Sequence, residues 1–155
     1  TKAFELANES NIFCTAHAGE ALGAHSVSET LEKLKPSRIG HGVRSIEDKS
    51  LLKKLKANNI HLELCLTSNI VTKVYKSFKD HPADFLYKND FSISINTDGR
   101  TISDTNLNNE YGILGTHFNW IKSHFLKVNI NSMEASFANS NIKTKIISNL
   151  KSSYN

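Results

Sequence analysis

The chain has 155 residues, 39% of them hydrophobic, which is enough for one ordinary domain with a packed core. No stretch approaches the roughly 18 uninterrupted apolar residues of a membrane span, and the first residues lack the basic flank and apolar centre of a signal peptide. The formal charge of +4 comes from scattered lysines, which is typical of a solvated surface rather than a nucleic-acid-binding stripe. Cys14 and Cys65 form no CxxC pair, which favours reduced thiols. We therefore expect a cytoplasmic protein without a membrane or nucleic-acid partner.

Short apolar runs alternate with helical patterns along the whole chain. Strands are predicted at residues 12–16, 38–40, 60–66 and 91–97. Helices are predicted at residues 2–9, 26–35, 45–57, 105–118, 120–137 and 142–155, and shorter helical pieces broken at Pro82 at residues 70–88. Strands that alternate with helices of crossover length indicate an α/β fold with a parallel sheet.

Two serines are expected to begin helices. Ser26, with Glu29 three residues later, has the pattern of a capping box. Ser45 is placed to cap the helix that follows the second strand.

Each predicted strand is followed by a polar group of chemical interest. These groups are His17, His41, Ser68 or Asn69, and Asp98. In a (β/α)₈ barrel, the carboxyl ends of several strands contribute the functional residues at one rim. Four consecutive βα units are half of such a barrel, so the sequence predicts half a barrel with a shared site.

His17 and Glu20 could combine a metal ligand with a proton carrier. A neutral imidazole suits zinc, and a nearby glutamate outside the ligand set can move protons to and from water. The structural alternative is that His17 caps a strand and Glu20 opens a helix. His41 and Asp98 at equivalent strand ends favour a metal-assisted hydrolytic site with zinc or a related metal. The other five histidines are given no role.

Four motifs occur at these strand ends. They are His17-Ala18-Gly19-Glu20, Arg38-Ile39-Gly40-His41-Gly42, Glu63-Leu64-Cys65 with Thr67-Ser68-Asn69, and Ser94-Ile95-Asn96-Thr97-Asp98. In order and spacing they resemble the adenosine deaminase family. The tail is also similar to that family's closing helices, from Phe125-Leu126 to Ser136-Phe137. The resemblance covers essentially the whole chain.

The resemblance implies a zinc-dependent TIM-barrel aminohydrolase of purine metabolism that converts adenosine to inosine and ammonia, with adenosine or deoxyadenosine as the purine nucleoside it binds. His17 and Asp98 would be ligands of one zinc ion in the complete barrel. Glu20 would pass a proton to the purine ring, and His41 would orient or activate the attacking water. Gly19 and Arg100 are expected near the substrate.

The chain departs from the family pattern in two important places. The family's other two metal ligands form an H-x-H motif after the first strand, and no H-x-H occurs in this sequence. The family usually has a second aspartate after the metal-binding one, where this chain has Gly99 followed by Arg100. The purine contact therefore stays open.

Residues 1–155 are thus expected to form a single partial domain, with strands 5 to 8 of the barrel and the C-terminal helices, and to lack the N-terminal half. Two functions remain possible. The chain is either the C-terminal part of an adenosine deaminase, whose site is completed by residues absent here, or an inactive half-barrel remnant or interaction module. The fragment alone is expected to be inactive, because a catalytic zinc site normally has three protein ligands.

Overall fold

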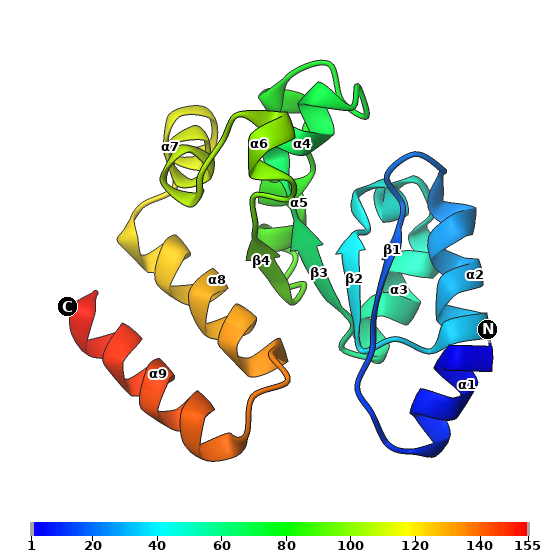
Figure 1. The fold of residues 1–155 in the computed structure, drawn as a ribbon. Helices are drawn as coiled ribbons and strands as arrows, with labels where there is room; N and C mark the ends of the chain where they lie inside the picture. Colours follow the sequence, from blue (N-terminus) through cyan, green and yellow to red (C-terminus); the bar gives the residue numbers. More distant parts are fainter. Residues whose placement is uncertain (1, 155) are drawn as a thin grey trace.

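The computed structural model describes residues 2–154 and contains a four-stranded parallel sheet (Figure 1). Its strands are β1 (Thr15–Ala18), β2 (Arg38–His41), β3 (His61–Leu64) and β4 (Ile93–Ile95). They lie in chain order, β1-β2-β3-β4, and every neighbouring pair is parallel. Parallel neighbours need a crossover between them, and helical segments provide each one. The predicted α/β fold is confirmed.

Helices surround the sheet on its sides and at the carboxyl ends of its strands. The α-helices are α1 (Lys2–Glu9), α2 (Ala24–Leu34), α3 (Lys49–Ala57), α4 (Leu66–Val71), α5 (Ala83–Lys88), α6 (Arg100–Ser103), α7 (Leu107–Phe118), α8 (Lys122–Ala135) and α9 (Ser140–Ser153), and the 3₁₀ turns are η1 (Val43–Glu47) and η2 (Phe78–Asp80). In Figure 1, α4 and α6 lie beyond the arrowheads of β3 and β4, and α9 turns back beside α8. None of the helices within residues 2–154 has the length and apolar character to cross a membrane.

One face of the sheet carries the hydrophobic core. Successive side chains of a strand point to opposite faces, so alternate apolar residues of the inner strands share this face. The fully buried strand residues are Ile39, Leu62, Leu64 and Ile93, and the helices cover them with Val27, Leu51, Leu55, Leu86 and Leu114. Burial of each such side chain stabilises the fold by about 1.5–3 kcal/mol.

The other face of the sheet is polar. Arg38 on β2 forms an ion pair with Glu63 on β3, with 3.0 Å between Nε and Oε1. The Thr15 hydroxyl of β1 donates to Oε2 of the same Glu63 at 3.4 Å. The Arg38 guanidinium also lies over the Phe137 ring, 4.0 Å from its centroid. These contacts link three neighbouring strands and the segment after α8.

Both predicted helix caps are wrong. The helix α2 begins two residues before Ser26, with Gly23 as its N-cap, and the Ser26 hydroxyl donates to the Gly23 carbonyl and accepts from the Gly19 N–H. Ser45 lies inside η1. The N-cap of α3 is Asp48, whose carboxylate accepts from the first turn of the helix. In both places a residue nearer to the true start of the helix occupies the cap.

The strand boundaries also differ from the predicted ones. β1 begins at Thr15, because Ile12 and Phe13 are 60% and 66% exposed and lead into the strand rather than pair in it. His17 is therefore a strand residue instead of the residue after a strand. β4 is shorter than predicted, and residues 67–69, expected as a polar exit from the third strand, are helical and belong to α4.

The buried histidine His61 links β3 to the β4 segment. Its Nδ1 is 2.8 Å from the Ser92 hydroxyl oxygen, and its Nε2 is 2.9 Å from that of Ser94. Burial lowers the pKa of His61 to about 4 because desolvation disfavours the charged imidazolium. The folded protein therefore holds this ring neutral at pH values where an unfolded chain protonates it.

We predict that stability falls as pH decreases below the unfolded histidine pKa of about 6.5. A depressed folded pKa gives stability that is present above 6.5 and lost as pH falls, at ~1.4 kcal/mol per pH unit for each such histidine. Urea unfolding followed by circular dichroism from pH 6.5 to 5 measures this slope, before most carboxylates titrate. His61→Gln should make the slope shallower. Equal slopes in the wild type and His61→Gln would contradict the prediction.

Candidate active site

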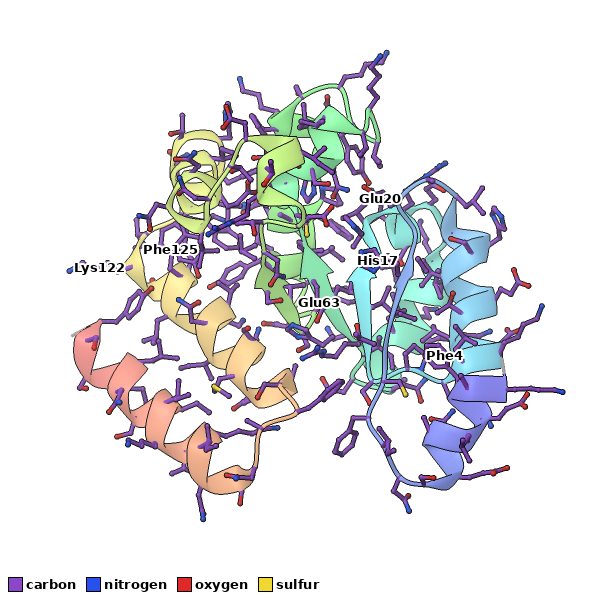
Figure 2. The ribbon with its side chains drawn as sticks, in the orientation of Figure 1. Phe4, His17, Glu20, Glu63, Lys122 and Phe125 are labelled. Atoms are coloured by element: carbon purple, nitrogen blue, oxygen red, sulfur yellow. The ribbon has the colours of Figure 1, made fainter. Side chains whose placement is uncertain are left out.

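The structure brings His17, Glu20, His41 and Asp98 together at the carboxyl ends of the parallel strands. The possible ligand atoms of His17, His41 and Asp98 all lie within 4.8 Å of one another. His41 Nε2 is 3.4 Å from Glu20 Oε2 and 3.8 Å from Asp98 Oδ2. Figure 2 shows His17 and Glu20 following one another along β1 toward the end of the sheet where α4 lies. We refer to these four residues as the rim cluster.

The backbone takes left-handed conformations where it enters this cluster. Gly19 follows β1 with φ 70°, His41 ends β2 with φ 62°, and Asp98 follows β4 with φ 56°. Such φ values are uncommon for residues other than glycine. Positive φ is not confined to the cluster, since seven other non-glycine residues of the described part of the chain share it, including Lys35 and Asn119 at helix C-caps.

Two glycines make room for the cluster. A Cβ on Gly19 would lie 2.5 Å from Val27 Cγ2, which is too close for any side chain. A Cβ on Gly40 would lie 3.0 Å from the His17 ring, so the missing side chain gives that ring its place beside β2. Close packing therefore explains why both positions are glycine. The substrate contact predicted for Gly19 remains a prediction.

The short helix α4 and its C-cap residue Thr72 hydrogen-bond to three of the four cluster residues. The bonds run from Ser68 Oγ to Asp98 Oδ2 at 2.7 Å, from Asn69 Nδ2 to His41 Nδ1 at 3.0 Å, and from Thr72 Oγ1 to Glu20 Oε1 at 3.1 Å. The sequence predicted that Ser68 or Asn69 lies near the site but did not predict which residues they contact. Nothing in the sequence indicated a role for Thr72. These bonds orient both carboxylates and the His41 ring.

A buried carboxylate holds the start of α4. Glu110 of α7 is fully buried; its Oε2 accepts the backbone N–H of Thr67 at 3.1 Å, and its Oε1 accepts the Thr105 hydroxyl at 2.7 Å. A negative charge at a helix N-terminus is stabilising. The sequence analysis missed this residue, and the only available signal was an acidic residue on the same helix face as Leu114.

Asp98 and His41 differ in charge within the cluster. The hydrogen bond from Ser68 lowers the pKa of Asp98, and the nearby rings of His41 and His17 act in the same direction. Burial lowers the pKa of His41, against the opposite effect of Glu20. Near pH 7, therefore, Asp98 is ionised and His41 is neutral.

The donor atoms suit a transition metal. Two imidazoles and a carboxylate are typical ligands of zinc. Among the described residues, His41 Nε2 is buried and has no hydrogen-bond partner, so its orientation toward the cluster calls for a ligand or a bound molecule. Glu20 lies beside this group, with Oε2 3.4 Å from His41 Nε2, but is not one of the three residues whose ligand atoms all lie within 4.8 Å of one another.

Two hollows lie beside the cluster. One of about 410 Å³ is lined by His17, Gly19 and Glu20. Another of about 360 Å³ is lined by Asp98 and by Arg100, which is exposed at the start of α6. Arg100 therefore lies next to a cluster residue, and the substrate contact expected of it remains a prediction.

Comparisons with known proteins agree with this geometry. A family model described as Adenosine deaminase matches residues 1–153. An adenine deaminase from Mesorhizobium japonicum is 37% identical over 149 residues, which are 96% of this chain and 46% of the relative. An adenosine deaminase from Danio rerio is 36% identical over 154 residues, which are 99% of this chain and 43% of the relative.

Comparison with solved structures agrees with the sequence comparison. The crystal structure of an Arabidopsis N6-mAMP deaminase superposes with a TM-score of 0.87 and 30% identity, over 97% of this chain and 44% of that one. The chain thus spans somewhat less than half the length of the relatives it matches, and its four strands form the C-terminal half of their (β/α)₈ barrel. The family match and the two sequence relatives place this chain in the adenosine deaminase family.

Proposed function

We propose that the full-length protein hydrolytically deaminates a 6-aminopurine compound, with adenosine or deoxyadenosine as the first candidates and inosine or its deoxy form and ammonia as products. The observation that carries the proposal is the rim cluster itself, in which three possible metal ligands and the Glu20 carboxylate share one strand rim. Its relatives include enzymes named for adenine, adenosine and N6-mAMP, so the choice of adenosine rests on the motifs of this sequence.

We assign His17 and Asp98 to the metal. Asp98 is ionised and exposed enough to reach an ion, and His17 lies beside it. A catalytic zinc site normally has three protein ligands, so the remaining ligands would come from the part of the full-length protein outside this chain. A bound zinc ion would supply the Lewis acidity that makes water nucleophilic at neutral pH.

Glu20 would carry the proton to the purine ring. Water attacks an aromatic carbon with difficulty unless the neighbouring ring nitrogen is protonated at the same time, and a positioned carboxylic acid provides that proton. The Thr72 hydroxyl oxygen lies 3.1 Å from Oε1 of Glu20 and 2.8 Å from the Ser68 carbonyl oxygen, so its one proton is shared between two acceptors. Oε2 of Glu20 is directed toward His41. His41 would orient the attacking water. Overall, the reaction consumes water and releases ammonia.

The competing function is an inactive remnant or interaction module. The absence of an H-x-H motif from this sequence favours it for the chain alone. The intact cluster and its contacts to α4 favour an enzyme for the full-length protein. Zinc content and deaminase activity separate the two, because a remnant predicts neither.

Glu20→Gln should lower kcat for adenosine deamination by about 10²–10⁴-fold, the usual contribution of a general acid or base. The amide keeps the shape and the hydrogen bond to Thr72 but cannot transfer the proton. Zinc content, measured by atomic emission, should stay at the wild-type level. Glu32→Gln, at an exposed carboxylate on α2 that pairs with Lys54, serves as the matched control. An unchanged kcat in Glu20→Gln would refute the assignment.

Asp98→Ala should lose zinc, and its loss of activity should result from the loss of zinc. Removing a proposed ligand is expected to weaken zinc affinity by at least about 10²-fold, since even outer-shell partners contribute 10–100-fold. Activity should then follow zinc occupancy during titration with the metal. Asp90→Ala removes an exposed aspartate that pairs with Lys127 and should change neither quantity. Full zinc occupancy in Asp98→Ala would show that Asp98 is not a ligand.

Arg100→Ala should raise KM more than it lowers kcat if Arg100 binds the nucleoside. A hydrogen bond from a charged group contributes about 1.5–3 kcal/mol, which corresponds to roughly 10–100-fold in KM. Lys79→Ala, an exposed cation elsewhere on the chain, is the control. Steady-state kinetics with an unchanged KM would remove Arg100 from the substrate site.

A further inference from the structure

A chain of buried hydrogen bonds runs from the backbone of α5 to the rim cluster through His81 and Asn69. It begins at the Ala83 N–H, which lies 3.2 Å from His81 Nδ1. A backbone N–H can only donate, so Nδ1 is the unprotonated nitrogen of His81. Burial lowers the pKa of His81 to about 3, which leaves the ring neutral with its single proton on Nε2.

This proton fixes the orientation of the Asn69 amide. His81 Nε2 lies 3.1 Å from Asn69 Oδ1, and Asn69 is fully buried. The reverse orientation would set the amide NH₂ against the His81 N–H, and a buried donor without an acceptor costs about 1–3 kcal/mol. Asn69 therefore directs its NH₂ away from His81 and toward His41.

The amide in turn fixes the tautomer of His41. Asn69 Nδ2 lies 3.0 Å from His41 Nδ1. Because the amide nitrogen donates, Nδ1 must accept, and the proton of the neutral ring resides on Nε2. Nε2 faces Glu20 Oε2 at 3.4 Å and Asp98 Oδ2 at 3.8 Å.

We infer that Asn69 and His81 are positioning residues that hold His41 as an N–H donor at Nε2 and so keep it out of the metal shell. A metal ligand needs a lone pair, and Nε2 has none in this tautomer. His41 thus differs from His17, although both rings lie within ligand distance of Asp98. The inference concerns the site of the proposed function, and its reading of the tautomer holds whether or not the protein is a deaminase.

The Nε2–H of His41 then has a defined task. It can donate to the oxygen of a water molecule beside Asp98, which leaves an oxygen lone pair free for attack. In this tautomer His41 orients the nucleophile and does not abstract its proton. That proton must go to a carboxylate, and Asp98, beside which the water lies, is the one available, because Glu20 gives its own proton to the purine ring in the same step.

Asn69→Asp removes the donor to His41 with little change of shape. It also removes the 3.5 Å contact of Asn69 Nδ2 with Glu20 Oε1, so the tautomer of His41 is the readout specific to this role. The carboxylate has nearly the same shape and still accepts from His81, but it cannot donate. It should hold the His41 proton on Nδ1 and leave a lone pair on Nε2. Asn139→Asp, at the exposed N-cap of α9 where the side chain accepts from Ile142 N–H, is the matched control, because aspartate caps as well as asparagine.

Long-range ¹H–¹⁵N correlation spectra of ¹⁵N-histidine-labelled, metal-free full-length protein report the tautomer directly. The wild type and Asn69→Asp should have His41 protonated on Nε2 and Nδ1, respectively. Asn139→Asp should match the wild type. His81→Phe removes the anchor of the amide and should give a mixture of the two tautomers. A wild-type His41 protonated on Nδ1 would overturn the inference, even if every variant failed to fold.

Kinetics provide the second readout. Asn69→Asp should lower kcat for adenosine by at least about 10²-fold with little change in KM and no loss of zinc. A wild-type kcat in a folded Asn69→Asp protein with the changed tautomer would contradict the positioning role. If the tautomers behave as expected but the wild type has no deaminase activity, the proposed function fails and the structural inference stands.

Discussion

The rim cluster depends on three hydrogen bonds donated by α4 and its C-cap residue Thr72. They go to the side chains of Asp98, His41 and Glu20, which lie at three different strand ends. Six residues are too few for a helix that is stable alone, so α4 needs support from the fold. Glu110 supplies it by accepting the first-turn N–H of Thr67 from a fully buried position. The position of the rim cluster is thereby connected to the packing of α7, far along the sequence from β1 and β2.

The same bonds stabilise a backbone that local preferences oppose. His41 and Asp98 both have positive φ values, which cost energy in residues other than glycine. Asn69 and Ser68 bond to the side chains of these two residues. The hydrogen bonds from α4 thus hold both side chains in the rim cluster.

The sequence predicted the parallel α/β fold and the shared strand rim, because these follow from local periodicity and from the fixed geometry of parallel strands. It failed where the outcome depends on tertiary contacts. Ser26 matched a capping box but bonds to Gly19 and Gly23 instead. Glu110 and His81 gave no signal of function, since their role is to support other residues across the core. Motif resemblance identified the cluster, and only the structure showed what holds it.

The most direct test of this account is anomalous diffraction at the zinc edge from crystals of the full-length protein. The account predicts one strong peak within bonding distance of His17 and Asp98, with His41 Nε2 outside the first shell. Zinc bound directly to His41 Nε2, or a crystal whose rim cluster binds no metal at saturating zinc, would contradict it.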